Sequence, residues 1–347
     1  MLTKPKSKLL AALVVVTVFL ALPVAAQATL VFTRNPFHPQ VWVANDNGSG
    51  AKLLAHGRQP RVSPDGQTVV YERSQKSHGY RTELMLVSAN GGGAPRPLLT
   101  NWAEPYVFSW SPDSSTIAVI AGSGIGGNRR LLTIDLANGS QRTIAKGYFS
   151  GASFSPDGTE LAYSKAGSEQ YPPRSDIYRA SLATGKSVRL TKDHASETPL
   201  WGPNGQIVFI KLLDADKRRY GPKSDLFLMN AEGGQVKRLT HTKVDPLLFG
   251  LSPTQWSASG DQLLTEFGGQ DTSYAVTVNP KTGAEKTLTD ERETGFVGTA
   301  LSADGTTVLG SLGGFEPGPD HKVVTIPYQG GKPKTLANNA SEPDWSR

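Results

Sequence analysis

The chain has 347 residues, with 36 basic and 30 acidic side chains and no cysteine. The absence of cysteine excludes disulfide bonds, thiol nucleophiles and cysteine-ligated metals. The first 28 residues contain three lysines and no acidic residue, which leaves 33 basic and 30 acidic residues in the rest of the chain. So small an excess gives no argument for nucleic-acid or membrane-surface binding.

The N-terminal segment predicts export. Three lysines up to Lys8 precede an apolar run from Leu9 to Leu22, and Ala26-Gln27-Ala28 offers the small residues that a signal peptidase recognises. We expect residues 1–28 to be a secretory signal, with an uncleaved membrane anchor as the alternative, and the product to be periplasmic or secreted. No later stretch has the roughly 18 apolar residues of a membrane span, so no stable membrane insertion is expected after signal removal.

A pattern centred on Gly151–Thr191 recurs along the rest of the chain. Pro156-Asp157-Gly158 has the chemistry of a tight turn between two strands, and Ile177–Leu182 and Ser187–Leu190 predict a third and a fourth strand. Matching turns lie at Pro64-Asp65-Gly66, Pro112-Asp113, Pro203-Asn204-Gly205, Ser259-Gly260 and Asp304-Gly305. Turns about 45 to 50 residues apart are typical of four-stranded propeller blades.

The two ends of this region complete each other. Residues 341–346 begin one more repeat, and Leu30–Phe32, Gln40–Ala44 and Lys52–Leu54 supply the strands that it lacks. We therefore predict one all-β domain over residues 29–347, a seven-bladed β-propeller of four-stranded antiparallel blades. Pairing of the C-terminal strand with the N-terminal blade is expected to close the ring and to remove its exposed sheet edges. Tryptophans at one repeat position are expected to pack between blades: Trp110, Trp201, Trp256 and Trp345.

Two segments make a resemblance specific. SDLFLMNAEGGQVKRLT at 224–240 and FSWSPD at 108–113 resemble the WD40-like repeats of the TolB propeller family. The resemblance covers the whole region after the signal and implies the propeller fold. It does not imply one function, since such repeats occur in binding proteins, in propellers attached to prolyl-oligopeptidase-type hydrolases, and in some lyases. The α/β domain that precedes the TolB propeller is not expected here, and TolB has six blades, so a Tol-Pal role is not implied.

The meander pattern gives the domain two different faces. The Pro-Asp-Gly turns and the third-to-fourth turns share one side, here called the turn face, whereas the second-to-third loops and the blade-to-blade links share the other, here called the loop face. The longest and most varied loops belong to the loop face, which is where function usually resides on a rigid scaffold. Its basic and aromatic residues are the predicted ligand- or partner-binding residues: Arg81, Arg130, Arg174, Arg218, Arg219 and Tyr220.

We therefore expect a monomeric, non-enzymatic binding module without a cofactor. Its expected partner is a protein of the cell envelope or an anionic glycan, and not nucleic acid. The alternative is a metal-dependent carbohydrate lyase or hydrolase of the oligogalacturonate-lyase type, working at the mouth of the channel. That alternative depends on three histidines in blade-to-blade links and on four carboxylates near the channel. These residues are His56, His194, His241, Glu104, Glu197, Glu342 and Asp344.

Other enzyme signatures are weak. Gly122–Gly127 matches G-x-G-x-x-G, but Arg130–Ile134 follows in the register of a third strand, where a dinucleotide site needs a helix. The sequence has no G-x-S-x-G elbow and no H-E-x-x-H motif. We therefore interpret these glycines as a flexible loop.

Overall fold

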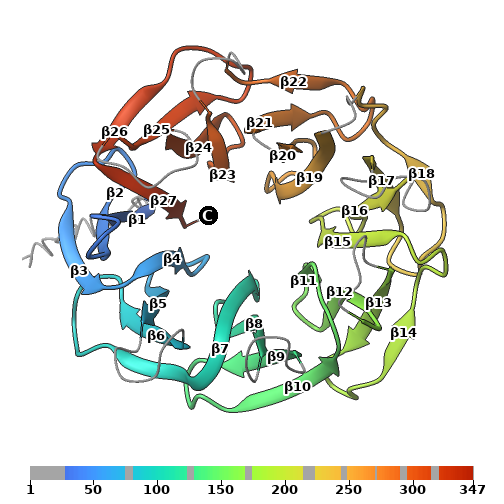
Figure 1. The fold of residues 1–347 in the computed structure, drawn as a ribbon, viewed down its shortest axis with the longest axis horizontal. Helices are drawn as coiled ribbons and strands as arrows, with labels where there is room; N and C mark the ends of the chain where they lie inside the picture. Colours follow the sequence, from blue (N-terminus) through green and yellow to red (C-terminus); the bar gives the residue numbers. More distant parts are fainter. Residues whose placement is uncertain are drawn as a thin grey trace, which may run out of the picture.

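The computed structural model describes residues 28–74, 81–122, 129–168, 174–213, 223–243, 248–269, 272–289, 295–313 and 320–346. These residues form β-strands joined by turns, and the strands succeed one another around a central opening (Figure 1). Within them, no helix is long and apolar enough to cross a membrane.

The strands form antiparallel meanders that repeat in chain order. The first two meanders contain β4 (Arg58–Val62), β5 (Thr68–Ser74), β6 (Arg81–Ser88) and β7 (Arg96–Trp110), followed by β8 (Thr116–Gly122), β9 (Arg130–Asp135) and β10 (Gln141–Lys146). The next contains β11 (Ala152–Phe154), β12 (Glu160–Ala166), β13 (Ser175–Ser181) and β14 (Ser187–Arg189). The long strand β7 pairs with β6 and also with β8, so it serves both of the meanders that it joins.

Three further groups follow the same plan. The first contains β15 (Ser196–Trp201), β16 (Ile207–Leu212), β17 (Ser224–Met229) and β18 (Lys237–Arg238). The second contains β19 (Leu248–Trp256), β20 (Leu263–Gly269), β21 (Ser273–Val278) and β22 (Glu285–Thr287). The third contains β23 (Val297–Leu301), β24 (Thr307–Leu312), β25 (Lys322–Pro327) and β26 (Lys334–Asn338). A single parallel bridge between Ser224 and Gly250 connects the first two of these groups.

The last strand joins the first three strands in one sheet. That sheet has the order β27 (Ala340–Trp345), β1 (Thr29–Arg34), β2 (Gln40–Asn45) and β3 (Lys52–His56). Leu30 pairs with Trp345, and Ser346 and Thr29 exchange hydrogen bonds, with Ser346 N donating to Thr29 O at 3.0 Å and Thr29 N to Ser346 Oγ at 2.9 Å. The predicted pairing of the C-terminal strand with the N-terminal strands is therefore present.

The turns that give the sequence its period share one hydrogen-bond pattern. Ser63 Oγ donates to Asp65 Oδ1 at 2.5 Å and accepts from the Thr68 amide at 2.9 Å, while Gly66 adopts φ of 72°. The same serine-aspartate pair recurs at Ser111-Asp113, Ser155-Asp157 and Ser302-Asp304. Hydrogen bonds from the neighbouring serine hydroxyl are the main cause that lowers the pKa of Asp113, Asp157 and Asp304. Each carboxylate therefore holds its turn closed in its ionised form.

The core consists of apolar layers between neighbouring meanders. One layer packs Val31 and Val41 against Val69 and Tyr71, and another packs Phe32 against Leu309 on the opposite side of the same sheet. Second and third strands are buried on both sides, as continuous apolar runs require. The predicted tryptophans belong to this packing. Trp256 Nε1 donates to Leu200 O at 3.2 Å, and Trp345 Nε1 donates to Leu301 O at 2.9 Å. Each of these bonds joins two neighbouring meanders.

Candidate functional site

Third strands begin at the loop face with basic residues. Arg81 begins β6, Arg130 begins β9, and Arg174 directly precedes β13. The topology therefore places the backbone of these three predicted residues at equivalent positions of successive meanders. The side chain of Arg81 and all of Arg218, Arg219 and Tyr220 lie outside the described residues.

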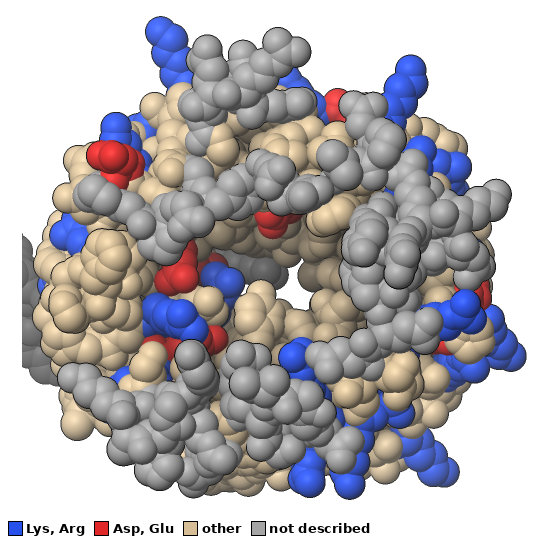
Figure 2. All heavy atoms as spheres, in the orientation of Figure 1, with Lys and Arg blue, Asp and Glu red and all other residues tan. Residues whose placement is uncertain are grey.

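Two neighbouring meanders bring several cations together at the loop face. Arg130 on β9 pairs across the ladder with Lys146, the last residue of β10. The link that follows touches the next meander, where Tyr148 and Ala166 form a β-bridge and Lys165 carbons lie about 3 Å from the position of a Cβ built on Gly147. Figure 2 shows lysine and arginine gathered at the lower right, over β10 to β14. We call Arg130, Lys146, Lys165 and Arg174 the basic cluster.

Three members of the basic cluster have no carboxylate partner in the described part of the chain. No ion pair involves Arg130, Lys146 or Lys165 there, and the Arg130 guanidinium instead lies 5.5 Å from the centre of the Trp102 ring. Unpaired cations on a rigid edge are available to an incoming anion. Lys146 was not predicted as a site residue, because one lysine ending an exposed fourth strand gives no signal in the sequence.

Other loop-face cations are neutralised within the protein. Arg73 Nη2 lies 2.7 Å from Glu83 Oε2, and Lys211 Nζ lies 2.8 Å from Asp193 Oδ2. Burial raises the pKa of Asp193, but hydrogen bonds from Lys211 and Ser196 outweigh it, so the pKa is lowered. The positive charge of the loop face is therefore reduced at these positions.

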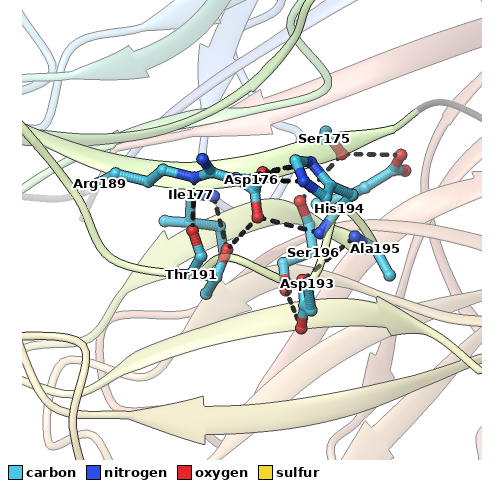
Figure 3. A network of polar contacts seen from close by, with 10 residues as sticks. Ser175, Asp176, Ile177, Arg189, Thr191, Asp193, His194, Ala195 and Ser196 are labelled. Carbon is cyan, nitrogen blue, oxygen red and sulfur yellow. Dashed lines mark hydrogen bonds and ion pairs between the residues drawn. The ribbon is translucent and has the colours of Figure 1, made fainter.

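The histidines proposed as metal ligands do not form a cluster. His194 lies beside Asp176, with Nδ1 3.0 Å from Oδ2, and the Arg189 guanidinium contacts the same carboxylate at 2.5 Å (Figure 3). His56 and His241 are exposed and belong to other meanders: His56 is the last residue of β3, and His241 follows β18. Among the residues that the structure describes, no group of three or more histidines and acids is arranged to hold a metal ion.

The Asp176 network has a structural counterpart in the next meander. Thr191 Oγ1 donates to Asp176 Oδ1 at 3.2 Å (Figure 3). In the same way Thr240 Oγ1 donates to Asp225 Oδ1 at 3.2 Å, and Arg238 pairs with the other oxygen of Asp225. A buried aspartate that takes an arginine and a threonine from the following strand clamps the third and fourth strands together. His194 belongs to this clamp, and the repeat explains it without a metal.

The carboxylates near the channel differ in their bonding. Glu342 Oε2 accepts from Thr33 Oγ1 at 2.7 Å and from the Gln59 amide at 2.8 Å, which ties β27 to β1 and β4. Within the described residues the Glu197 carboxyl has one partner, the hydroxyl of Ser175 at 3.1 Å, and burial raises its pKa to about 7. The side chain of Glu104 lies outside the described residues.

The first strands line a central cavity of about 800 Å³. In four of these strands the residue before the last core residue bonds the neighbouring meander. Asp344 Oδ2 accepts from the Val62 amide at 3.0 Å, and Ser153 Oγ accepts from the Trp201 amide at 3.1 Å. Ser109 and Gln255 accept in the same way from Phe154 and Leu301. Side chains at this position therefore join neighbouring meanders around the cavity.

Arg61 occupies the same position in β4 and departs from this pattern, because a guanidinium cannot accept an amide hydrogen. Burial lowers its pKa, but Asp344, Tyr106 and Glu342 outweigh burial and raise the pKa above its ordinary value. Figure 2 shows positive and negative side chains next to each other beside the central opening. Arg61 was not predicted as a site residue; the signal in the sequence was a basic residue at a repeat position that has no other basic residue.

Comparisons with known proteins bear on the fold. No family model matches the chain. One sequence match, 32% identical over 115 residues, is to the Bacillus subtilis (strain 168) protein described as uncharacterized peptidase YuxL. The match covers 32% of this chain and only 16% of that protein, so it concerns a small part of the relative.

Solved structures cover most of the chain. TolB from Acinetobacter baumannii is similar with a TM-score of 0.56 and 17% identity, over 92% of this chain and 83% of that one. An oligogalacturonate lyase in complex with manganese is similar with a TM-score of 0.57 and 16% identity, over 89% of this chain and 84% of that one. A puromycin-hydrolyzing peptidase of Mycobacterium tuberculosis is similar with a TM-score of 0.62 and 18% identity, over 89% of this chain and 53% of that one. At such identities the likeness shows the fold alone. The chain therefore has the β-propeller fold of TolB and its structural relatives, as the resemblance implied.

Proposed function

We propose that the chain is an exported, seven-bladed β-propeller that binds an anionic partner at its loop face without doing chemistry. The basic cluster carries this proposal. It joins two meanders at one edge, and three of its members have no described carboxylate partner. Arg81, Arg218, Arg219 and Tyr220 would extend the same surface, and the lysine-led apolar segment before residue 29 supports export.

The closed ring gives the loop face its rigidity in this proposal. Seven apolar clusters lie in the described residues, and each contains side chains from two neighbouring meanders, so they follow one another around the opening. The sheet of β27 with β1, β2 and β3 packs on both its neighbours through two of them. This arrangement supports seven blades closed by β27. A rigid edge limits the entropy lost on binding.

The enzyme alternative has less support. A peptidase and a lyase share the fold, but fold is not function. The histidines on which the lyase alternative depended are not brought together in the described part of the chain. We therefore retain the binding function as the conclusion.

Charge reversal at the basic cluster tests this function. The mature protein is titrated with two immobilised polyanions, polygalacturonate and poly-glutamate, at several salt concentrations. Binding by the wild type should weaken with salt and be lost in Arg130→Glu/Lys165→Glu, because the cluster then repels the anion. Lys186→Glu/Lys281→Glu is the matched control, since both lysines are exposed on the turn face.

The two probes separate the expected partner classes. Binding to poly-glutamate alone favours an acidic protein, and binding to polygalacturonate alone favours a glycan. The proposal is wrong if neither probe binds, or if both charge-reversed variants bind like the wild type. The melting temperature of each variant shows whether the fold is retained.

A further inference from the structure

The charged residues in the lining of the central cavity are Arg61, Asp344 and Glu266. Arg61 and Asp344 line it from β4 and β27, which are neighbours in space, whereas the β11, β15 and β23 walls contribute serine, threonine and apolar side chains. Asp344 at its position bonds the next meander, as serine does elsewhere. Arg61 shares a hydrogen bond with Tyr106 of β7, and this contact occupies only part of the donor capacity of a guanidinium.

The Arg61 guanidinium has donors to spare. It shares one side-chain hydrogen bond with Tyr106 and interacts electrostatically with Asp344 and Glu342. However, no carboxylate of the described residues forms an ion pair with it within 4.0 Å. A guanidinium presents five N–H donors in a fixed plane. A cavity-facing guanidinium with unused donors is suited to a ligand that brings hydrogen-bond acceptors.

An aromatic side chain lies next to this charged pair. Tyr106 is 42% exposed although it belongs to the cavity wall, and its ring packs edge-on against Phe108 with centroids 5.3 Å apart. Packing on Phe108 fixes the ring, so that a ligand meets a preorganised apolar surface. On another wall Ser252 and Thr254 add hydroxyl groups.

The charges around the cavity select against ions. An anion at Arg61 also meets Asp344 and Glu342, and a cation at those carboxylates also meets Arg61. A neutral ligand with adjacent hydroxyl groups avoids both repulsions, because one hydroxyl accepts from the guanidinium while the next donates to the carboxylate. The apolar face of a sugar ring also suits the Tyr106 side chain. The volume of about 800 Å³ falls within the range of small-molecule sites.

We propose that the central cavity is a binding site for a neutral sugar of one or two rings, held by Arg61 and Asp344 and stacked on Tyr106. This site is separate from the basic cluster and does not depend on the proposed binding of an anionic partner there. The sugar bonds the Arg61 donors that the hydrogen bond with Tyr106 leaves unused. No bond is made or broken in the ligand.

Calorimetric titration of the mature protein with cellobiose, maltose and di-N-acetylchitobiose tests the site, with digalacturonate as the charged comparison. We expect at least one neutral disaccharide to bind, and binding to weaken about tenfold or more in Tyr106→Ala and Arg61→Lys, since each loses a directional contact. Arg61→Lys keeps the charge beside Asp344, so a loss of binding is not caused by an unpaired carboxylate. Arg130→Glu should bind the sugar like the wild type.

Three results would overturn the proposal. They are no binding of any neutral disaccharide at millimolar concentration, binding of digalacturonate alone, and unchanged binding in both Tyr106→Ala and Arg61→Lys. Amide chemical shifts of the β4 and β7 residues give a second readout, because a sugar in the cavity must move them. Loss of polyanion binding in the Arg130→Glu/Lys165→Glu variant has no bearing on this result.

Discussion

At the scale of single residues, the buried carboxyl of Glu197 should make the stability of the fold depend on pH. Glu197 belongs to β15, and among the described residues its carboxyl is bonded by Ser175 alone. Burial raises its pKa to about 7, so the folded protein prefers the protonated carboxyl. The unfolded chain ionises this group at its ordinary, lower pKa. Ionisation therefore favours unfolding as the pH rises from about 4.5 toward 7.

Glu197→Gln tests this effect. Glutamine resembles the protonated acid and still accepts from Ser175, so wild type and variant should have equal stability near pH 4.5. Above pH 7 the variant should be more stable, by about 3 kcal/mol at most for a shift of this size. Thermal unfolding at both pH values measures the difference. Glu232→Gln, at a carboxylate that is 71% exposed, is the control and should give no pH-dependent gain. A constant difference for Glu197→Gln would contradict the shift.

Single residues also show what the sequence could and could not reveal about the site. Arg130 and Arg174 were predicted at the loop face, because a third strand must begin there once the meander is recognised. Arg73 is another basic residue at the loop face, but Glu83, one strand away, neutralises it. That pairing depends on the register of β5 with β6, which the sequence period does not specify at the resolution of one residue. Arg61 was missed for a related reason, since only its place in the cavity wall distinguishes it from an ordinary surface arginine.

At the scale of elements, the third-to-fourth turns offer a matched pair of glycines. Gly139 and Gly283 both have φ of 73°, and the amide of each donates over 2.8 Å to the carbonyl four residues earlier. A Cβ built on Gly139 meets nothing within 4 Å, whereas one on Gly283 lies 1.9 Å from Leu239 O in the preceding meander. The two turns thus share a backbone conformation and differ in their packing.

Alanine substitution at each glycine should separate the free-energy cost of a side chain at positive φ from the cost of a clash between meanders. Gly139→Ala is expected to destabilise by about 1 kcal/mol, the cost of a side chain at positive φ. Gly283→Ala is expected to cost at least about 3 kcal/mol, because two meanders must also move apart. Chemical denaturation of the two variants measures this. Equal losses of unfolding free energy in the two variants would show that the meanders accommodate the added methyl group at no cost.

The strands also show where the sequence repeat predicts the fold and where it does not. The predicted strands at Ile177–Leu182 and Ser187–Leu190 correspond to β13 (Ser175–Ser181) and β14 (Ser187–Arg189). In contrast, β7 continues from Arg96 to Trp110 and runs through Pro105, where the repeat predicts a link. Proline lacks the amide donor of a ladder. The strand nevertheless continues, because its two halves pair with different neighbours and the register shifts between Ala103 and Tyr106.

At the scale of the whole molecule, the pairing of β27 with β1 should control stability. Removing residues 340–347 exposes the edge of β1 and uncovers Leu30 and Phe32, which are fully buried. We expect the truncated protein to lose cooperative unfolding or to melt far below the wild type, because the apolar layers on both sides of that sheet lose support. Differential scanning calorimetry checks this. A variant that lacks only residue 347 should melt like the wild type, and equal melting of both truncations would contradict a closed ring.

The contacts between Thr29 and Ser346 also determine where the molecule can be attached to something else. Thr29 Oγ1 donates to Gly66 O at 3.2 Å, so both ends of the described chain meet beside a Pro-Asp-Gly turn, on the turn face. If the apolar segment before residue 29 stayed in a bilayer, it would hold the protein by that face and direct the basic cluster away from the lipid. A surface tether or reporter joined to either end would likewise leave the opposite side free for binding measurements.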